Sequence, residues 1–324
     1  MPVLLVSSLR PLVGKTAISV GMAQRLDQDG YRPGLARLAT AESDEAAQAD
    51  ARCFASLSLS AEKRGQPLSL EEVAGLAKGT GSSDGVLIGE LPAGSPPGEA
   101  VRAVGGGVVL VERSADLSAG KVAAFQKEIG QGFVGLVLTA VPSARTAAIA
   151  DTLAQKGIPI LALLPEDRSL SSPSIAEMAQ ALEAETLFAD GRTEEVIERV
   201  TIAPISADPG QGYFARFDRQ AVVVRCDKPD LQLAALNAAS RCLILSGGRM
   251  PLAYVSERAE AEGIPLLITD KDTVSALQAL EPLYLKSRFG HQKAERIGQL
   301  MAEHLDYDRL LRALGLRQKG SSGS

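Results

Sequence analysis

Short hydrophobic runs alternate along this chain with longer segments in which apolar positions recur every three or four residues. The runs are brief and uninterrupted by polar positions, which is typical of strands buried on both faces of a parallel sheet. In the first half of the chain they predict strands at residues 3–6, 34–38, 86–88, 108–111, 134–138 and 160–164. Helices are expected between them, so this part predicts a doubly wound α/β domain.

Two local signals mark expected helix starts. Ser69 is followed three positions later by Glu72 and then by apolar positions, the pattern of a capping box. Ser172 is followed by Pro173, and proline is well tolerated in the first turn of a helix. We therefore expect helices to begin at both places.

The periodicity breaks over residues 201–218, where two prolines and two glycines fall in the segment from Thr201 to Tyr213. This pattern is typical of a linker or a domain boundary. A second α/β series follows, with strands expected at 222–224, 243–245 and 266–268 and helices at 231–239, 251–262, 273–280 and 293–304. The expected division is a first domain at 1–205, a smaller α/β domain at 206–318, and a disordered tail or expression scar at 319–324.

Composition narrows the possible functions. The net charge of -5, from 34 basic and 39 acidic residues, lacks the basic excess of a nucleic-acid-binding protein. No apolar run approaches the roughly 18 residues of a membrane span, and no charged leader precedes the first strand. Three scattered cysteines and two histidines give no disulfide framework or zinc spacing. We expect a cytoplasmic protein without a nucleic-acid or membrane partner.

The first strand leads into a short loop, then into Gly14, Lys15 and Thr16, and then into apolar positions at helical spacing. Backbone N–H groups and the positive helix end would face a polyphosphate there. Lys15 would reach the terminal phosphates, and the Thr16 hydroxyl would bind Mg²⁺. The usual pattern has glycine where this chain has Leu9, so Gly14 could also be an ordinary turn before a helix. The expected nucleotide contacts of this stretch are Ser8, Arg10, Val13, Gly14, Lys15 and Thr16.

A phosphate loop that binds Mg²⁺ also needs carboxylates. Glu90 follows the expected strand at 86–88, and Asp50 follows the strand at 34–38, which contains Arg37 near its end. Ligands of open α/β sheets bind at the carboxyl ends of the strands, where these residues should meet. Alternatively, Glu90 is an exposed loop acid, Asp50 lies on a solvated helix face, and Arg37 is a surface arginine.

Other candidates have equally ordinary alternatives. Arg10 would either add charge beside a nucleotide or pair with a nearby acid. Pro165 and Glu166 follow the last expected strand of the first domain, where a loop would either cover a base or form a plain turn.

The second α/β series offers two further loops. Asp227 and Lys228 follow one strand, and Ser246, Gly247 and Gly248 follow the next. Two such loops at one sheet edge would form a ligand cleft or a subunit contact. They would equally serve as helix caps and turns.

Together these motifs resemble a known family. The first domain resembles dethiobiotin synthetase and the cobyrinic acid a,c-diamide synthase group of P-loop proteins. The matching stretches are Gly14-Lys15-Thr16, Gly30-Tyr31-Arg32-Pro33, Asp50-Ala51, Gly89-Glu90, Leu138-Thr139-Ala140-Val141-Pro142 and Leu164-Pro165-Glu166-Asp167-Arg168. Over residues 1–316 the chain resembles the N-terminal region of long bacterial phosphotransacetylases, in which a DRTGG domain follows the P-loop domain.

This resemblance implies roles for individual residues. Lys15 and Thr16 match the phosphate and Mg²⁺ residues, and Asp50 and Glu90 match the Mg²⁺ carboxylates. Arg37 stands where that family has a lysine that binds substrate or phosphate.

Three departures concern the base and the second domain. Thr139 stands where relatives often have the asparagine that reads adenine. Lys228 and Ser246 stand at the arginine and the threonine of the DRTGG motif, and both changes are mild.

The resemblance implies a nucleotide-responsive regulatory protein that binds ATP and Mg²⁺, hydrolyses ATP slowly or not at all, and dimerises or senses a small ligand through the DRTGG-like domain. The resemblance allows for a protein partner that this chain regulates, but does not identify one. The acetyltransferase domain of phosphotransacetylases is not matched, so synthesis of acetyl phosphate is not expected. The alternatives are an ATP-dependent ligase that activates a carboxylate and a degenerate P-loop that serves only as a scaffold.

Overall fold

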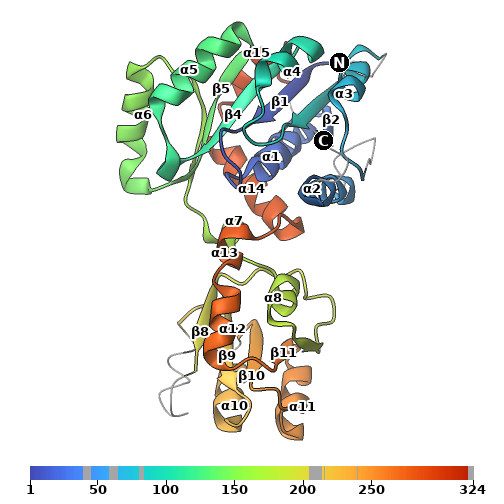
Figure 1. Ribbon diagram of the computed structural model, residues 1–324, viewed down its shortest axis with the longest axis vertical. Helices are drawn as coiled ribbons and strands as arrows, with labels where there is room; N and C mark the ends of the chain where they lie inside the picture. Colours follow the sequence, from blue (N-terminus) through green and yellow to red (C-terminus); the bar gives the residue numbers. More distant parts are fainter. Residues whose placement is uncertain are drawn as a thin grey trace. The chain divides into compact units, whose positions relative to one another are not determined.

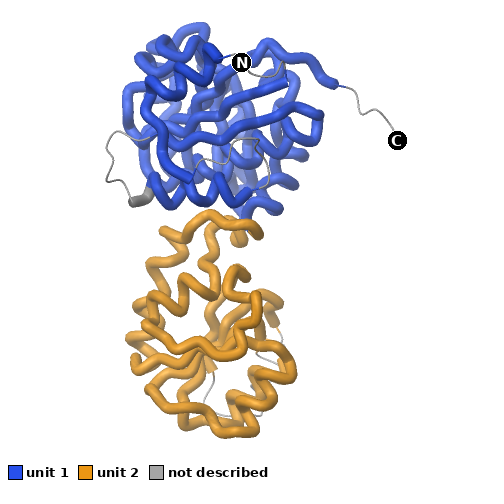
Figure 2. Tube along the Cα trace, turned by 90° about the vertical axis from the view of Figure 1, so that its right-hand side faces the viewer, with its two compact units in different colours: residues 1–167, 293–324 blue, residues 168–292 orange. Residues whose placement is uncertain are grey.

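The computed structural model describes residues 1–38, 45–57, 65–79, 84–203, 214, 216–238 and 240–319. The chain divides into two compact units, unit 1 with residues 1–167 and 293–324 and unit 2 with residues 168–292 (Figure 2). Unit 1 is therefore built from two separate parts of the chain, and unit 2 is inserted between them.

Unit 1 contains a six-stranded sheet in the order β2-β3-β1-β4-β5-β6, and every neighbouring pair is parallel. Its strands are β1 (Val3–Ser7), β2 (Arg32–Arg37), β3 (Gly85–Glu90), β4 (Gly107–Arg113), β5 (Phe133–Val141) and β6 (Ile160–Pro165). Its helices are α1 (Lys15–Gln28), α2 (Glu45–Ser56), α3 (Leu70–Lys78), α4 (Pro97–Val104), α5 (Ala119–Ile129), α6 (Thr146–Gln155), α14 (His291–His304) and α15 (Tyr307–Ala313). The predicted doubly wound α/β class is confirmed.

Helices cover both faces of this sheet (Figure 1). On one face, Leu5 and Leu110 of the strands pack with buried residues of α3 to α6, such as Val122 and Leu153. On the other face α1 meets α14, and α15 contacts β5 and β6. Helices α14 and α15 come from the C-terminal part of the chain, so the core of unit 1 is completed only after unit 2 has been made.

Unit 2 has a five-stranded sheet in the order β7-β11-β10-β9-β8, in which only β7 runs antiparallel among the described pairings. Its strands are β7 (Glu185–Leu187), β8 (Arg199–Ile202), β9 (Gln220–Arg225), β10 (Cys242–Ser246) and β11 (Leu266–Thr269). Its helices are α7 (Arg168–Ser171), α8 (Ile175–Leu182), α10 (Pro229–Asn237), α11 (Ala253–Ala261), α12 (Thr273–Leu280) and α13 (Leu283–Lys286). Apolar side chains fill both faces of the sheet.

The observed division of the chain differs from the expected one at 205/206. Those two residues lie outside the described part, as do 204–213 of the expected linker and 320–324 of the expected tail. Strand β8, before the expected boundary, pairs with β9 after it, so both strands belong to one sheet. Lys319, expected in the tail, contacts unit 1: its Nζ lies 2.6 Å from Asp84 Oδ1, and its backbone N–H donates to Asp29 Oδ2.

The two expected helix starts have different outcomes. Ser69 caps α3 with the predicted capping box to Glu72, which is confirmed. The start at Ser172 and Pro173 is wrong by two residues, because Ser174 is the N-cap of α8 and forms its own capping box with Glu177. Proline therefore precedes the cap here instead of entering the first turn.

In the part of the chain that the structure describes, no helix has the length and apolar character needed to cross a bilayer.

The contact between α1 and α14 makes a testable prediction at Gly21. A Cβ at this position would lie 2.6 Å from Met301 Cγ and 3.0 Å from Ile297 Cγ1. We expect Gly21→Ala to lower the free energy of unfolding by about 1–3 kcal/mol, because overpacking outweighs the gain in helix propensity. Urea unfolding followed by circular dichroism measures this change.

Gly75→Ala in α3 is the matched control, since a Cβ there meets no atom within 4 Å. It should stabilise the protein by about 0.5–1 kcal/mol. Equal effects of the two substitutions would contradict the close approach of α1 and α14.

Candidate functional site

The loop between β1 and α1 has the predicted strand–loop–helix form. β1 ends at Ser7, and α1 begins at Lys15. Gly14 has φ 94°, a left-handed conformation that favours glycine, and its carbonyl accepts the N–H of Ile18 in the first helical turn. The glycine before the lysine is thus required by the backbone at this position.

Four charged side chains from separate stretches of sequence meet beside this loop. Arg37 Nε lies 3.3 Å from Asp50 Oδ2 and 3.8 Å from Glu90 Oε1. Lys15 Nζ lies 4.0 Å from the same Glu90 oxygen. Arg37 and Glu90 come together because β2 and β3 are adjacent parallel strands whose carboxyl ends share one edge, and Lys15 and Asp50 come from α1 and α2. The sequence expectation that these residues meet at this edge agrees with the structure.

The cluster is mostly removed from solvent. The side chains of Lys15, Arg37 and Glu90 are 7%, 8% and 3% exposed, and that of Asp50 is 29% exposed. Burial raises the pKa of Glu90 to about 7, against the opposing effect of Arg37 and Lys15. Burial also lowers the pKa of Lys15, although Glu90 opposes this shift. The surface-residue alternatives for Glu90 and Arg37 therefore do not hold.

Arg37 is also fixed to the backbone. Its Nη1 donates to the carbonyls of Leu38 and Glu90, each at 3.1 Å. Gly89 fits this region because a Cβ there would lie 3.0 Å from Leu38 Cδ1 and 3.2 Å from Leu5 Cδ2. The residue types around Glu90 thus follow from close packing between β3 and its neighbours.

The donor set at this edge fits Mg²⁺. The Thr16 hydroxyl lies close enough to Glu90 to lower the pKa of its carboxyl group, and Glu90 Oε2 is buried without a hydrogen-bond partner. Mg²⁺ usually takes one or two carboxylates and completes its shell with water and substrate phosphate. No group of three or more histidine, cysteine or acidic residues suited to a metal occurs among the described residues. A magnesium ion held here would therefore depend on a nucleotide for further ligands.

A second buried acid, Glu112 at the carboxyl end of β4, was missed by sequence reasoning. Its Oε1 accepts the N–H of Leu9 at 2.7 Å, and burial raises the pKa of its carboxyl group. The sequence held a signal for it, because Glu112 directly follows the apolar run from Val108 to Val111, near the end of the strand. Leu9 occupies the position usually held by glycine. Its backbone N–H is bound by the Glu112 side chain of the neighbouring strand, which fixes the start of the loop.

The remaining loop residues mostly hold the loop to itself or to the sheet. Ser8 Oγ accepts from Lys15 Nζ at 3.0 Å and donates to the Arg10 carbonyl at 2.7 Å. Arg10 pairs with Asp116, which is the acid-pairing alternative for this residue. Thr139 Oγ1 donates to the carbonyl of Val13 at 3.0 Å. Contact of these residues with a nucleotide stays a prediction.

The contact from Glu112 to the loop makes a second testable prediction. Glu112→Ala removes the acceptor of the Leu9 N–H, a bond to a carboxylate for which about 1.5–3 kcal/mol is typical. We expect amide hydrogen exchange over residues 8–14 to accelerate by about tenfold or more, measured by mass spectrometry. Glu128→Ala, on the exposed side of α5, should leave this exchange unchanged. Unaltered exchange in Glu112→Ala would contradict the anchoring role.

Pro165 and Glu166 lie away from this cluster along the sheet. Pro165 ends β6, which is separated from β1 by β4 and β5. Glu166 is exposed, and its N–H donates to the Val141 carbonyl at 3.2 Å. Their proposed contact with a base stays a prediction.

In unit 2 the two candidate loops lie at adjacent strand ends, since the Cys226 N–H donates to the Ser246 carbonyl. Asp227 pairs with Arg225 at 2.6 Å on the surface, and Lys228 is the N-cap residue of α10. Ser246 Oγ lies 2.9 Å from Thr273 Oγ1. These contacts fit the cap-and-turn alternative; a ligand or subunit contact here stays a prediction.

Gly247 and Gly248 both have positive φ, at 98° and 69°. The Gly247 N–H donates to the carbonyls of Thr269 and Lys271, and the Gly248 N–H donates to that of Thr269. Their N–H groups therefore join the end of β10 to the loop after β11 and are not available to a bound anion in this conformation.

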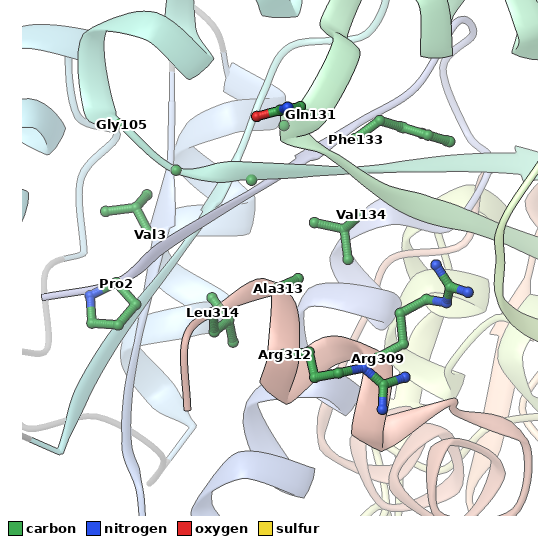
Figure 3. A pocket seen from close by; sticks show the side chains of 13 residues that line it. Pro2, Val3, Gly105, Gln131, Phe133, Val134, Arg309, Arg312, Ala313 and Leu314 are labelled. Atoms are coloured by element: carbon green, nitrogen blue, oxygen red, sulfur yellow. The ribbon is translucent and has the colours of Figure 1, made fainter. Parts of the chain in front are cut away.

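A cavity of about 590 Å³ lies at the opposite edge of the unit 1 sheet. It is lined by the amino-terminal ends of β1, β4 and β5 and by α15, from which Arg309 and Arg312 extend (Figure 3). Gly106 is explained by packing, since a Cβ there would lie 2.3 Å from the Val3 carbonyl oxygen, whereas Gly105 has a positive φ of 66°. None of the ligand-binding or catalytic residues predicted from the sequence lines this cavity.

Comparison with known families concerns the inserted part of the chain. Residues 177–283 match the family model of the DRTGG domain. This part of unit 2 is a DRTGG domain. The match begins within α8, earlier than the expected second domain, and ends before α14, which completes unit 1.

Among solved structures, the chain is similar to the CBS and DRTGG domains of the regulatory region of Clostridium perfringens pyrophosphatase, crystallised with the activator diadenosine tetraphosphate. The identity is 16%, the alignment covers 48% of this chain and 82% of that one, and the TM-score is 0.32. A likeness this weak does not bear on what the present chain binds.

Proposed function

We propose that this chain is a nucleotide-responsive regulatory protein that binds ATP with Mg²⁺ in unit 1, with little or no hydrolysis. The observation that carries the proposal is the meeting of Lys15, Thr16, Arg37, Asp50 and Glu90 beside the β1–α1 loop. The presence of the DRTGG domain supports the regulatory reading, and we propose that it senses a ligand or forms a homodimer.

Each residue of the cluster has a distinct part in binding. Lys15 would pair with the terminal phosphates, and backbone N–H groups at the start of α1 would face the same oxygens. Thr16, Glu90 and Asp50 would hold Mg²⁺, which would neutralise part of the phosphate charge. Arg37 lies beside both carboxylates, and its guanidinium would turn toward a terminal phosphate.

Calorimetric titration with ATP, ADP and GTP in the presence of Mg²⁺ tests this proposal. We expect saturable binding by the wild type and a loss of about tenfold or more in Lys15→Ala, since charged hydrogen bonds are worth about 1.5–3 kcal/mol. Lys121→Ala is the control, because Lys121 is exposed on α5. No binding of any nucleotide by the wild type would overturn the proposal and favour a scaffold role for unit 1.

Phosphate release separates the regulator from a ligase that activates carboxylates. In a ligase, a substrate oxyanion would attack the γ-phosphate while Lys15 and Arg37 stabilise the transferring group. We expect slow release from ATP that added carboxylic acids do not accelerate. Strong acceleration by an acid would replace the regulatory proposal with the ligase.

A further inference from the structure

Arg37 occupies the space between the two carboxylates proposed for Mg²⁺. Its Nε is 3.3 Å from Asp50 Oδ2 and 3.8 Å from Glu90 Oε1, and its side chain is 8% exposed. A guanidinium at these distances can replace a metal ion as the positive charge beside both carboxylates. The nucleotide-free cluster therefore sets two basic side chains, Lys15 and Arg37, against two acidic ones, Asp50 and Glu90.

A divalent cation would upset this balance if it entered alone. Two further positive charges would then stand beside two buried cations, and repulsion between charges is stronger where solvent is excluded. A polyphosphate changes the situation by bringing negative charge to the same place. The guanidinium can then turn to phosphate oxygens, for which its planar fork is well suited, while the carboxylates become available to the metal.

We propose that Arg37 is an internal counter-ion that holds Asp50 and Glu90 in the nucleotide-free protein, so that Mg²⁺ and nucleotide bind as a coupled pair. This inference rests on the proposed function of unit 1. It adds that the metal does not bind tightly before the nucleotide. The metal site is closed by Arg37 until a phosphate draws the arginine away. By thermodynamic reciprocity, the metal must then raise the affinity for nucleotide by the same factor.

Binding of Mn²⁺, followed by electron paramagnetic resonance, tests the coupling without any need for catalysis. We expect the affinity of the wild type for Mn²⁺ to rise by about tenfold or more when ADP is present, within the usual range of coupling between sites. Without nucleotide, Arg37→Gln should bind Mn²⁺ about tenfold more tightly than the wild type, because the guanidinium that lies between the two carboxylates is gone. In this variant ADP should raise the Mn²⁺ affinity by a smaller factor than in the wild type, because only the phosphate ligands then contribute.

Arg32→Gln is the matched control, since Arg32 is an exposed arginine on the same strand. It should behave as the wild type. Arg37→Lys should have a nucleotide-free Mn²⁺ affinity between those of the wild type and Arg37→Gln. An ammonium keeps the positive charge but lacks the forked N–H donors that contact both carboxylates. Circular dichroism confirms that each variant is folded; if Arg37→Gln is not, Arg37→Lys takes its place, and a gain of Mn²⁺ affinity over the wild type without nucleotide decides the proposal.

Two results would overturn the proposal: equal Mn²⁺ affinity of the wild type with and without ADP, or no gain of affinity in a folded Arg37→Gln variant. Failure of the proposed function is distinguishable from these. If the wild type binds no nucleotide, the comparison of nucleotide-free wild type with Arg37→Gln still shows whether Arg37 closes a cation site.

Discussion

A chain that ends at residue 292 should fail to fold unit 1, although it keeps the whole sheet and every residue of the proposed site. The missing part contributes side chains that are almost fully buried, including Ile297, Leu300, Met301 and Leu310. Tyr307 is also lost, whose hydroxyl donates to Asp29 Oδ2 at 3.0 Å. Each apolar side chain contributes about 1.5–3 kcal/mol by burial, so their sum is comparable with the 5–15 kcal/mol that stabilises a typical protein.

Hydrogen exchange of the β1 and β4 segments, measured by mass spectrometry, reports directly on unit 1. In the truncated chain these strands should lose protection, whereas a chain that ends at residue 319 should keep it. The strands of unit 2 serve as an internal reference, since their core is formed without α14 and α15. Full protection of β1 in the shorter chain would show that the C-terminal helices are dispensable, contrary to this account.

The second large effect is expected at Glu90. Glu90→Ala leaves Arg37 and Lys15 buried with one fewer carboxylate, and breaking a buried ion pair typically costs about 3–5 kcal/mol. We expect a loss in this range in the free energy of unfolding, measured with urea.

Asp50→Ala tests whether burial is the cause. Asp50 also faces Arg37, but its side chain is 29% exposed, so its pairing is weakened by solvent. We expect a loss of about 1 kcal/mol or less. If the two variants are equally destabilised, the ion pairs of the cluster are not ranked by burial as the structure implies.

The strands of both units could be predicted because most are short apolar runs, a pattern that depends only on burial. The Gly14-Lys15-Thr16 loop could be predicted for a similar reason, since it combines a required backbone conformation with a helix start. The placement of Glu90 and Arg37 at one edge followed from the rule that parallel strands share their carboxyl ends. Their direct contact did not follow, because it depends on the pairing of β2 with β3.

What the sequence did not predict are features made by contacts between distant residues. The insertion of unit 2 into unit 1 depends on α14 packing against Gly21, more than 270 residues earlier. Strands β7 and β8 are short and partly exposed, so they lack the apolar pattern of the others. Glu112 was missed because an acid in a strand is usually solvated, and its partner, the Leu9 N–H, has no side-chain signal.

The most direct test of the central claim is to locate the bound nucleotide by hydrogen exchange with and without ATP and Mg²⁺. We expect new protection in residues 8–16 and 86–92 of unit 1, and we expect it to be absent in Lys15→Ala. Protection confined to the DRTGG domain, with no change in the β1–α1 loop, would place the nucleotide site in unit 2 and contradict the account.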